Sequence, residues 1–381
     1  MMRQQLLPPK RILHLIDTPG PGGAESICVE LIAGLRARSH AGVAAPPHGS
    51  WVERQLLGTP IETVAVDSAG RQRLRQRSAL LATSRCDIVQ AHLLGAGVDA
   101  ALLTLRHRVP AVVTFHGPPD FSAVGVRHRL YSLLLKQRRV RVVTVSRALA
   151  TIASDWLALD ERRIDVIPNG VELSAVPQER NWTFRRSLGI SDSAVVLGAI
   201  GNFRVGKRHD LLVETLIRLR ATGVDAHAII IGEHAEPMHR ELMTLAQMGG
   251  VATALHLPGF RTDVADWLPD FDVFLSTSDG EGFSLALVQA MGARVPVIAT
   301  RSGGPQEILE EGRWGSLVPT GNVEALLAAV HALLGDPELV RTRRHDAHAH
   351  AMALYTRPSM IDAYERLYAE MLDGRRSSTA A

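Results

Sequence analysis

Two polar residues stand out in an apolar part of the second half of the chain, where residues 277–300 read TSDGEGFSLALVQAMGARVPVIAT. Glu281 follows a strand pattern and is expected to begin a helix over 282–292, on which Gln289 also lies. A carboxylate here could accept hydrogen bonds from hydroxyl groups of a ligand, or it could simply stabilise the dipole of the helix that it begins. The sequence therefore predicts either a ligand-holding pair or a helix-start carboxylate with an ordinary polar neighbour.

A second group of charges follows another strand pattern, in GNFRVGKRHD at 201–210. Arg204 and Lys207 are expected beside the free backbone amides of a helix start, which would combine fixed positive charge with hydrogen-bond donors. That combination suits a diphosphate, most of all one whose negative charge grows as it leaves. A solvated helix start is the alternative interpretation.

Glycine-rich turns also follow predicted strands. TPGPGGAES at 18–26 opens a helix, and its glycines would let the backbone approach a phosphate or a sugar. In TFHG, His116 lies at a strand exit, and His92 has a similar place in VQAHLLG; either could be a structural histidine. With RSGGPQEIL after a strand at 295–300, five such turns at strand ends predict one shared binding region.

Several common site signatures are absent from the sequence. There is no G-x-G-x-x-G or G-x-x-x-x-G-K-[ST] match, which argues against dinucleotide and P-loop sites. No spacing of His, Cys, Asp or Glu resembles a metal site, and no nucleophile elbow is present. Cys28 and Cys86 lie in apolar-periodic stretches, so we expect buried thiols and a reducing compartment.

The elements that must position these residues alternate between short apolar runs and helical periodicity along both halves of the chain. This alternation predicts parallel, doubly wound sheets, whose ligands bind beyond the carboxyl ends of the strands. The polar stretch 171–190 is the predicted linker, so we expect two Rossmann-like domains, 1–180 and 186–355, facing each other across a ligand-binding cleft. An amphipathic helix at about 358–375 could pack on either domain.

Bulk composition fits a globular α/β protein, with 381 residues, 46% hydrophobic and 21% charged. The sequence contains no apolar run of transmembrane length, and residues 1–17 lack the features of a signal peptide and are expected to lead into the first strand. We therefore expect a cytoplasmic protein, with a peripheral place at the inner face of the membrane as a further option.

Charge is unevenly distributed along the chain. Residues 1–180 hold 23 Lys and Arg against 15 Asp and Glu, a net +8, whereas the remainder holds 19 against 24, a net −5. The basic half predicts an anionic partner. Its densest stretches are 70–77 and 126–141, and the latter interleaves apolar residues with arginines at roughly helical spacing. A solvated helix face and an anionic membrane surface are the two interpretations, and no nucleic-acid motif is present.

The motifs together resemble the family 4 glycosyltransferases. The matching segments occur in family order from about residue 12 to 325: GPGGAES, TFHG, VTVS, VIPNGVEL, GNFRVGKRHDLL, LPGFRTDV, DGEGFSLALVQAMGARVPVIAT, GGPQEIL and GSLVPTGN. The resemblance implies the GT-B fold, with the last helix crossing back to the first domain. It also implies retaining transfer from a nucleotide-diphosphate sugar to an acceptor hydroxyl, without a cofactor or catalytic metal. A glycan or lipid-linked acceptor, as in polysaccharide or glycolipid synthesis, would suit the basic first half.

The resemblance also implies roles for individual residues. Arg204 and Lys207 would grip the donor diphosphate, and Asn202 stands where the family often has an arginine. His116 would lie beside the transferred sugar, and Glu281 would bind its hydroxyls. The other expected donor contacts are Gly22, Gly23, Phe260, Arg261, Gly282, Phe283, Ser284, Leu285 and Gln289.

Gln289 departs from the family pattern, in which a second acidic residue commonly holds the ribose diol of the donor. An amide can accept from one hydroxyl and donate to the other oxygen, but without charge assistance. We therefore expect weaker donor affinity rather than lost chemistry. Two other functions stay open: a GT-B nucleotide-sugar epimerase or phosphorylase, and a non-catalytic nucleotide-binding partner protein.

Overall fold

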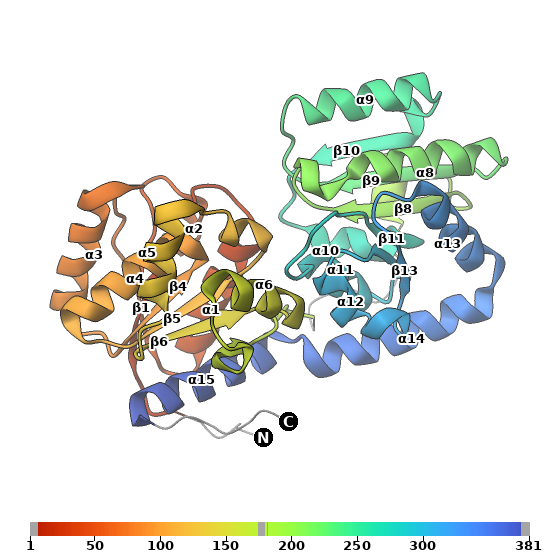
Figure 1. The fold of residues 1–381 in the computed structure, drawn as a ribbon. Helices are drawn as coiled ribbons and strands as arrows, with labels where there is room; N and C mark the ends of the chain where they lie inside the picture. The colour runs from red at the N-terminus through yellow and green to blue at the C-terminus, as the bar shows by residue number, and fades with distance from the viewer. Residues whose placement is uncertain (1–6, 174–179, 181, 375–381) are drawn as a thin grey trace. The chain divides into compact units, whose positions relative to one another are not determined.

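The computed structural model describes residues 7–173, 180 and 182–374, which form two compact units (Figure 1). The first unit runs to Gly170 and resumes at Arg357; the second is Val171–Thr356. The division thus falls before residue 180, where the sequence predicts the first domain to end. Most of the predicted tail, a large part of the predicted linker (174–179 and 181) and residue 375 of the last predicted helix lie outside the described residues.

The first unit is built on a seven-stranded sheet of parallel strands in the order β3-β2-β1-β4-β5-β6-β7. Parallel strands are covered by helices on both faces, so their residues form apolar runs such as AVVTF in β5, which is buried throughout. The direction in which strands are added reverses between β1 and β4, and ligands bind at such reversals. The strands are β1 (Arg11–Leu15), β2 (Ala41–Ala45), β3 (Glu62–Thr63), β4 (Ile88–His92), β5 (Ala111–Phe115), β6 (Val140–Thr144) and β7 (Ile164–Val166).

Helices connect these strands, and the last helix of the chain also belongs to this unit. They are α1 (Gly23–Ala37), α2 (Trp51–Leu56), α3 (Gly70–Ser84), α4 (Leu93–His107), α5 (Gly125–Leu135), α6 (Arg147–Leu157) and α15 (Arg357–Asp373). α15 packs against α1 and brings Tyr364 and Tyr368 to the sheet, where their hydroxyls lie 2.9 Å from Thr114 Oγ1 and Gln90 Oε1. Buried Glu365 of α15 pairs with Arg38 and His40.

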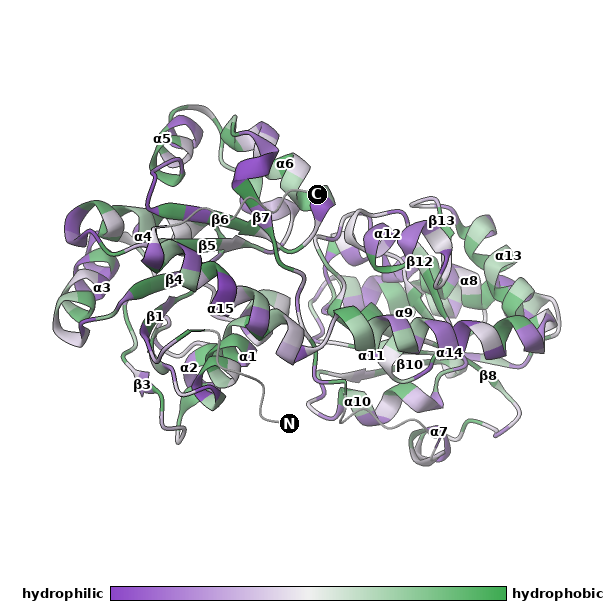
Figure 2. Ribbon diagram, turned by 90° about the horizontal axis from the view of Figure 1, so that it is seen from below, coloured by the Kyte–Doolittle hydropathy of each residue, from purple (hydrophilic) through white to green (hydrophobic). Residues whose placement is uncertain are grey.

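The second unit has a six-stranded parallel sheet in the order β10-β9-β8-β11-β12-β13, which reverses between β8 and β11. Its strands are β8 (Val195–Ile200), β9 (Ala226–Ile231), β10 (Leu255–Gly259), β11 (Val273–Ser276), β12 (Val297–Thr300) and β13 (Ser316–Val318). Figure 2 shows strands of both sheets largely in the hydrophobic colour, whereas the helices alternate. Gly198 of β8 leaves room for Phe271, since a Cβ at residue 198 would lie 2.0 Å from that ring.

In the second unit α8 and α13 pack on the sheet and on each other, α9 packs on α8, and α14 packs on α11 and α13. They are α7 (Thr183–Ser187), α8 (His209–Ala221), α9 (Met238–Met248), α10 (Val264–Trp267), α11 (Leu285–Gly292), α12 (Gly304–Ile308), α13 (Val323–Gly335) and α14 (Pro337–Leu354).

Both doubly wound parallel sheets confirm the predicted fold class. Cys28 and Cys86 are free and buried, as predicted. No helix among the described residues is both long and apolar enough to cross a membrane.

Candidate active site

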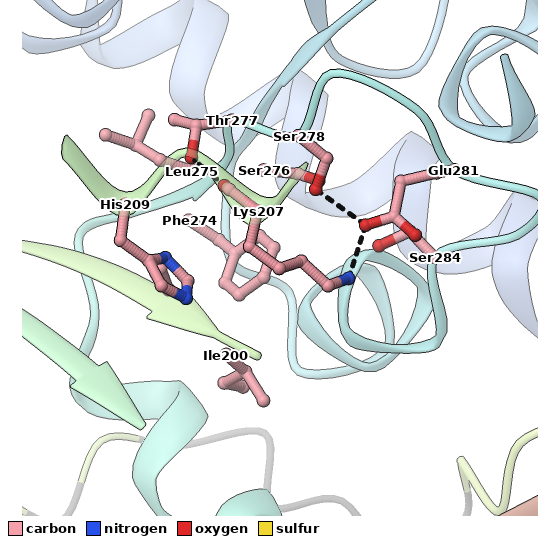
Figure 3. Close-up of a pocket in the computed structure, with 11 residues that line it drawn as sticks. Ile200, Lys207, His209, Phe274, Leu275, Ser276, Thr277, Ser278, Glu281 and Ser284 are labelled. Atoms are coloured by element: carbon pink, nitrogen blue, oxygen red, sulfur yellow. Dashed lines mark hydrogen bonds and ion pairs between the residues drawn. The ribbon is translucent and has the colours of Figure 1, made fainter. Parts of the chain in front are cut away.

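A small pocket opens at the carboxyl edge of the second sheet, where β8 and β11 are neighbours. Lys207 ends a 3₁₀ turn (Val205–Lys207) after β8, and Glu281 lies in the loop after β11. Although 74 residues separate them, the sheet order brings the two loops together, and the Lys207 amino group forms an ion pair with the Glu281 carboxylate (Figure 3). The pocket is lined by Ala199, Ile200, Lys207, His209, Phe274, Leu275, Ser276, Thr277, Ser278, Glu281 and Ser284.

The loop that carries Lys207 is fixed by backbone contacts. Thr277 Oγ1 donates to the Lys207 carbonyl at 2.9 Å, and Asp279 N–H donates to the Gly206 carbonyl at 2.9 Å. His209 Nε2 donates to the Gly201 carbonyl at 3.0 Å, and burial lowers the pKa of His209 to about 4, so its ring is neutral at neutral pH. The single flexible charge on this loop that enters the pocket is therefore Lys207, among the residues that line it.

Glu281 is held on both sides of its backbone. Its N–H donates to the Ser302 carbonyl, and its carbonyl accepts from Gly304 N–H, both at 2.8 Å. Gly304 permits this approach, because a Cβ there would lie 2.4 Å from the Gly282 carbonyl oxygen. Ser278 Oγ donates to Glu281 Oε1 at 2.6 Å. The backbone of Glu281 is thus fixed by the turn that contains Ser302 and Gly304, and its carboxylate is held by the Ser278 hydroxyl.

The prediction that Glu281 begins a helix over 282–292 is wrong. The helix α11 begins at Leu285, and its N-cap is Ser284, whose Oγ accepts from Leu287 N–H. Glu281 instead forms a β-bridge with Gly303. Glu281 lies outside α11, so it is not a helix-start carboxylate that stabilises the helix dipole. Of the two interpretations of Glu281, the structure therefore favours the one in which it holds a ligand.

Arg204 and Asn202, two other residues of the Lys207 loop with expected donor contacts, do not line the pocket. The Arg204 side chain is exposed and does not line the pocket. Asn202 Oδ1 accepts from Glu233 N–H at 3.0 Å, so this side chain ties the loop after β8 to the loop after β9. The structure brings the Lys207 and Glu281 side chains together, whereas Arg204 meets Lys207 through its backbone carbonyl, which accepts from Lys207 N–H at 2.9 Å.

The remaining expected donor contacts of the second unit lie on the loop after β10 and at the start of α11. Phe260 is exposed, and Arg261 pairs with Asp263 and lies 5.5 Å from the Trp267 ring. Gly282 and Phe283 are buried in the loop before α11, with Ser284 and Leu285 at its start. Gln289, half-buried on α11, makes no side-chain hydrogen bond with the described residues.

In the first unit, His116 follows β5 and meets His92 at the end of β4. The rings stack with centroids 5.2 Å apart, and His92 Nδ1 lies 2.9 Å from His116 Nε2. Burial lowers the pKa of His116 to about 3, and burial together with His116 and His14 lowers that of His92, so both rings are neutral. His92, for which the sequence favours a structural role, is thus the partner of the predicted site residue.

Asp120 fixes the loop that carries His116. One carboxylate oxygen accepts from His116 N–H (2.8 Å) and Gly117 N–H (3.2 Å), and the other accepts from Leu94 N–H (3.3 Å). Burial raises the pKa of Asp120 to about 6, against these three hydrogen bonds, which lower it. The motif HGPPD contained this signal, because a carboxylate four residues after a strand exit can cap the turn that it closes.

The glycine-rich turn of the first unit already contains a carboxylate. Gly22 precedes α1, and a Cβ at Gly22 would lie 2.4 Å from Glu25 Oε2. Glu25 is buried in the first turn of α1 and accepts a hydrogen bond from Thr18 Oγ1. Gly23 is exposed beside it. Within the described residues, no three His, Cys, Asp or Glu side chains are arranged to bind a metal ion.

Comparison with known families matches both units in turn. Residues 21–175 match the family described as Glycosyltransferase Family 4, and residues 194–336 match the family described as Glycosyl transferases group 1. The chain belongs to the family 4 glycosyltransferases. Together the two matches span most of the chain and include the loops of both sheets that hold the ion pair and the histidine pair.

Individual relatives of this glycosyltransferase are distant but cover most of its length. It is 27% identical over 292 residues to N-acetyl-alpha-D-glucosaminyl L-malate synthase of Bacillus anthracis, covering 75% of each chain. It is 27% identical over 340 residues to D-inositol 3-phosphate glycosyltransferase of Pseudarthrobacter chlorophenolicus, covering 81% of this chain and 78% of the other. The structure of Anabaena Alr3699/HepE in complex with UDP-glucose matches with a TM-score of 0.84 at 22% identity. The match covers 96% of this chain and 100% of the HepE chain. The last similarity shows the GT-B fold.

The enzyme is therefore a glycosyltransferase that moves a sugar onto an acceptor, with two Rossmann-like units of the GT-B type. Family membership favours this activity over the epimerase, phosphorylase and non-catalytic alternatives.

Proposed function

We propose that the enzyme is a retaining glycosyltransferase that takes its sugar from a nucleotide-diphosphate sugar and needs no metal ion. The observation that carries the proposal is the Lys207–Glu281 ion pair at the point where the second sheet reverses its strand order. A cation held there can neutralise the charge that develops on a departing diphosphate. The relative solved with UDP-glucose supports a nucleotide sugar as donor.

Each member of the ion pair has a distinct task in this proposal. Lys207 binds the diphosphate and stabilises the leaving group, as a metal ion would otherwise do. Glu281 accepts hydrogen bonds from hydroxyls of the transferred sugar, while Gly282, Phe283 and Ser284 present backbone groups. Arg204, exposed on the same loop, adds positive charge once donor is bound. Phe260 and Arg261 line the base site, and Gln289 binds the ribose.

The way Glu281 is bound argues against a covalent intermediate on this residue. A double displacement would need a carboxylate free to attack the sugar carbon, but Glu281 is held by the Ser278 hydroxyl and by backbone hydrogen bonds with Ser302 and Gly304. A carboxylate with these partners is a weak nucleophile, so we assign it to binding. In the retaining reaction that we propose, transfer takes place on the face that the diphosphate leaves, and catalysis rests on positioning and leaving-group stabilisation. In the first unit, Gly22 and Gly23 contact donor phosphates and His116 adjoins the sugar.

The acceptor in this proposal is an anionic glycan or lipid-linked hydroxyl compound. The basic first half of the chain supports it, as do the names of two relatives, since L-malate and D-inositol 3-phosphate are both anions. α5 favours a lipid-linked acceptor at an anionic membrane surface. It follows the His116 loop, and the exposed residues on it and at its N-cap combine apolar and basic side chains: Val124, Val126, Arg127, Arg129, Leu130 and Leu133. Such a helix face binds anionic lipid surfaces.

A donor panel tests the reaction. Purified enzyme is incubated with nucleotide sugars that differ in base and sugar, with soluble anionic acceptors in one arm and polyprenyl-phosphate acceptors in another, in EDTA. We expect transfer from one nucleotide class in the presence of EDTA, with the α-anomeric configuration of the donor kept in the product, as read by NMR. An inverted product, or activity lost in EDTA and restored by Mg²⁺, would overturn the retaining, metal-free assignment.

A matched pair of variants tests the membrane surface. Leu133 on α5 and Leu57 after α2 are both 69% exposed, so Leu133→Asp and Leu57→Asp carry the same change at equal exposure. We expect wild-type enzyme and Leu57→Asp to sediment with phosphatidylglycerol vesicles at low salt but not with phosphatidylcholine vesicles. Leu133→Asp should bind several-fold more weakly. Equal binding of the two variants would remove α5 from the proposal and leave the soluble acceptors.

A further inference from the structure

The histidine at the end of β4 has no role in the function described above, yet it contacts the one histidine that does. His92 is fully buried and cannot itself meet a substrate, whereas His116 is half-buried. Their contact, 2.9 Å between His92 Nδ1 and His116 Nε2, joins neighbouring strands of one unit. His92 can therefore influence a reaction only through His116.

Burial keeps both rings neutral, and a neutral imidazole carries one N–H and one bare nitrogen. In the His92–His116 contact, one nitrogen must donate and the other must accept. If His92 Nδ1 donates, His116 keeps its proton on Nδ1 and presents a donor there. If His116 Nε2 donates instead, its Nδ1 is a bare acceptor. The two tautomers are thus coupled: the state of His92 decides what His116 Nδ1 offers.

The free ends of this pair have no hydrogen-bond partner in the part of the chain that the structure describes. His116 Nδ1 and His92 Nε2 are buried and have no hydrogen-bond partner among the described residues. Buried polar atoms in native proteins normally have partners, so an unpaired ring nitrogen at a strand exit fits a group that awaits a ligand oxygen. His116 Nδ1 is the nitrogen that can serve this purpose, since Nε2 is engaged by His92.

The layer beneath the pair is rigid. Gln90 and Thr114 precede His92 and His116 by two residues, so they point to the same face of the sheet. Gln90 Nε2 donates to Thr114 Oγ1 at 3.0 Å, and Gln90 Oε1 accepts from the Tyr368 hydroxyl of α15 at 2.9 Å. The strands that carry the pair are thus joined by side-chain hydrogen bonds two residues before it, and Asp120 restricts the backbone of His116.

We propose that His92 is a positioning residue for the glycosyl transfer: it fixes the plane of the His116 ring and determines whether His116 Nδ1 presents a proton or a bare nitrogen to the transferred sugar. The proposal rests on the role assigned to His116 in the proposed function. A ring that rotates or changes tautomer would lose a directional hydrogen bond in the transition state while leaving most donor binding unchanged.

Three substitutions separate this role from packing. Asn at residue 92 places a polar atom near the position of Nδ1, Gln places it near Nε2, and Leu has none. We expect kcat of His92→Leu and His92→Gln to fall about 10- to 100-fold, as for second-layer residues and small misplacements. KM for the donor should change less than threefold. His92→Asn should retain kcat within about threefold of wild type. If His92→Leu does not fold, the comparison of Asn with Gln carries the test.

A double-mutant cycle with His116→Ala decides whether His92 acts through His116. We expect His92→Asn and His92→Gln to give the same kcat in the His116→Ala background, although they differ strongly in the wild-type background. Independent losses that multiply, or equal kcat of Asn and Gln variants with His116 present, would overturn the proposal. Wild-type activity of His116→Ala alone would instead contradict the proposed function, so the two failures are distinguishable.

Discussion

A pair of side chains lies at the carboxyl edge of each sheet, and the two pairs differ in charge and in exposure to solvent. In the second unit the pair is charged and reaches solvent, with side-chain exposures of 31% for Lys207 and 12% for Glu281. In the first unit His92 and His116 form a neutral pair, because burial lowers the pKa of each ring. The Lys207 side chain of an accessible ion pair can exchange its partner for an incoming anion, whereas a neutral histidine pair can only orient a hydrogen bond.

This difference assigns separate work to the two edges. Charge stabilisation belongs to the second unit, and directional contact with an uncharged sugar belongs to the first. Removing a charge should therefore impair catalysis most in the second unit, whereas changes in the first should act through geometry and protonation.

The largest effect should come from Lys207→Ala. Losing one charge-assisted contact to the leaving group typically lowers kcat on the order of 10²–10³-fold. Arg218→Ala, which removes another cation of an ion pair in the same unit, serves as the control and should leave kcat within about twofold. Steady-state kinetics with thermal unfolding measures both. Near wild-type turnover in folded Lys207→Ala would remove the charge-stabilising role from this edge.

The next effect concerns protonation in the first unit. Burial raises the pKa of Asp120 from 3.8 to about 6, so the folded state holds a proton that the unfolded state releases near pH 4. The folded state then binds more protons between these values, and the free energy of unfolding must fall as pH rises from about 4 to 6. The shift corresponds to a decrease on the order of 3 kcal/mol. The pKa of Asp17 is also raised by burial, which acts in the same direction.

Asp120→Asn tests this pH dependence, because the amide does not titrate. Urea unfolding between pH 4 and 7 should show wild-type stability falling relative to the variant as pH rises. Parallel curves for the two proteins would mean that the pKa of Asp120 is the same in the folded and unfolded states, and would contradict the effect of burial on this carboxyl group.

The sequence was sufficient to predict the sheets, because parallel strands buried on both faces leave apolar runs such as AVVTF between helical segments. It also indicated His116, Lys207 and Glu281, since each follows such a run. It did not predict which of them meet. The Lys207–Glu281 contact depends on β8 and β11 being neighbours, although β9 and β10 lie between them in the chain.

Two other features, the first residue of α11 and the His92–His116 contact, could not be predicted from the sequence pattern. Glu281 was expected to begin a helix because apolar periodicity continues through Gly282 and Phe283, yet Ser284 caps α11 and excludes them. The His92–His116 contact requires the register of β4 against β5, which offsets the pair by two residues. Sequence periodicity marks both histidines as strand-end residues but contains no information on that register.

Glu281→Gln sharpens the comparison within the second unit. The amide keeps the size of the side chain and can still accept from Ser278, but it removes the charge that balances Lys207. Hydrogen bonds to charged groups contribute about 1.5–3 kcal/mol, so kcat should fall about 10- to 100-fold if Glu281 binds the sugar. Affinity for the free nucleoside diphosphate should rise, because Lys207 loses its internal partner. Calorimetry showing no change in that affinity, with kcat also unchanged, would contradict an exchangeable ion pair.

The smallest effect should come from Gln289→Glu. The Gln289 side chain is half-buried on α11 and makes no hydrogen bond with the described residues, so it is available to a ribose diol. A carboxylate can accept from both hydroxyls with charge assistance, a gain on the order of 1 kcal/mol, or about fivefold in donor affinity, with little change in kcat. A donor that carries 2′-deoxyribose has only one of the hydroxyls and should show less of this gain. Weaker binding of the ordinary donor by Gln289→Glu would exclude the ribose contact, whereas an equal gain with the deoxy donor would assign it to some other part of the nucleotide.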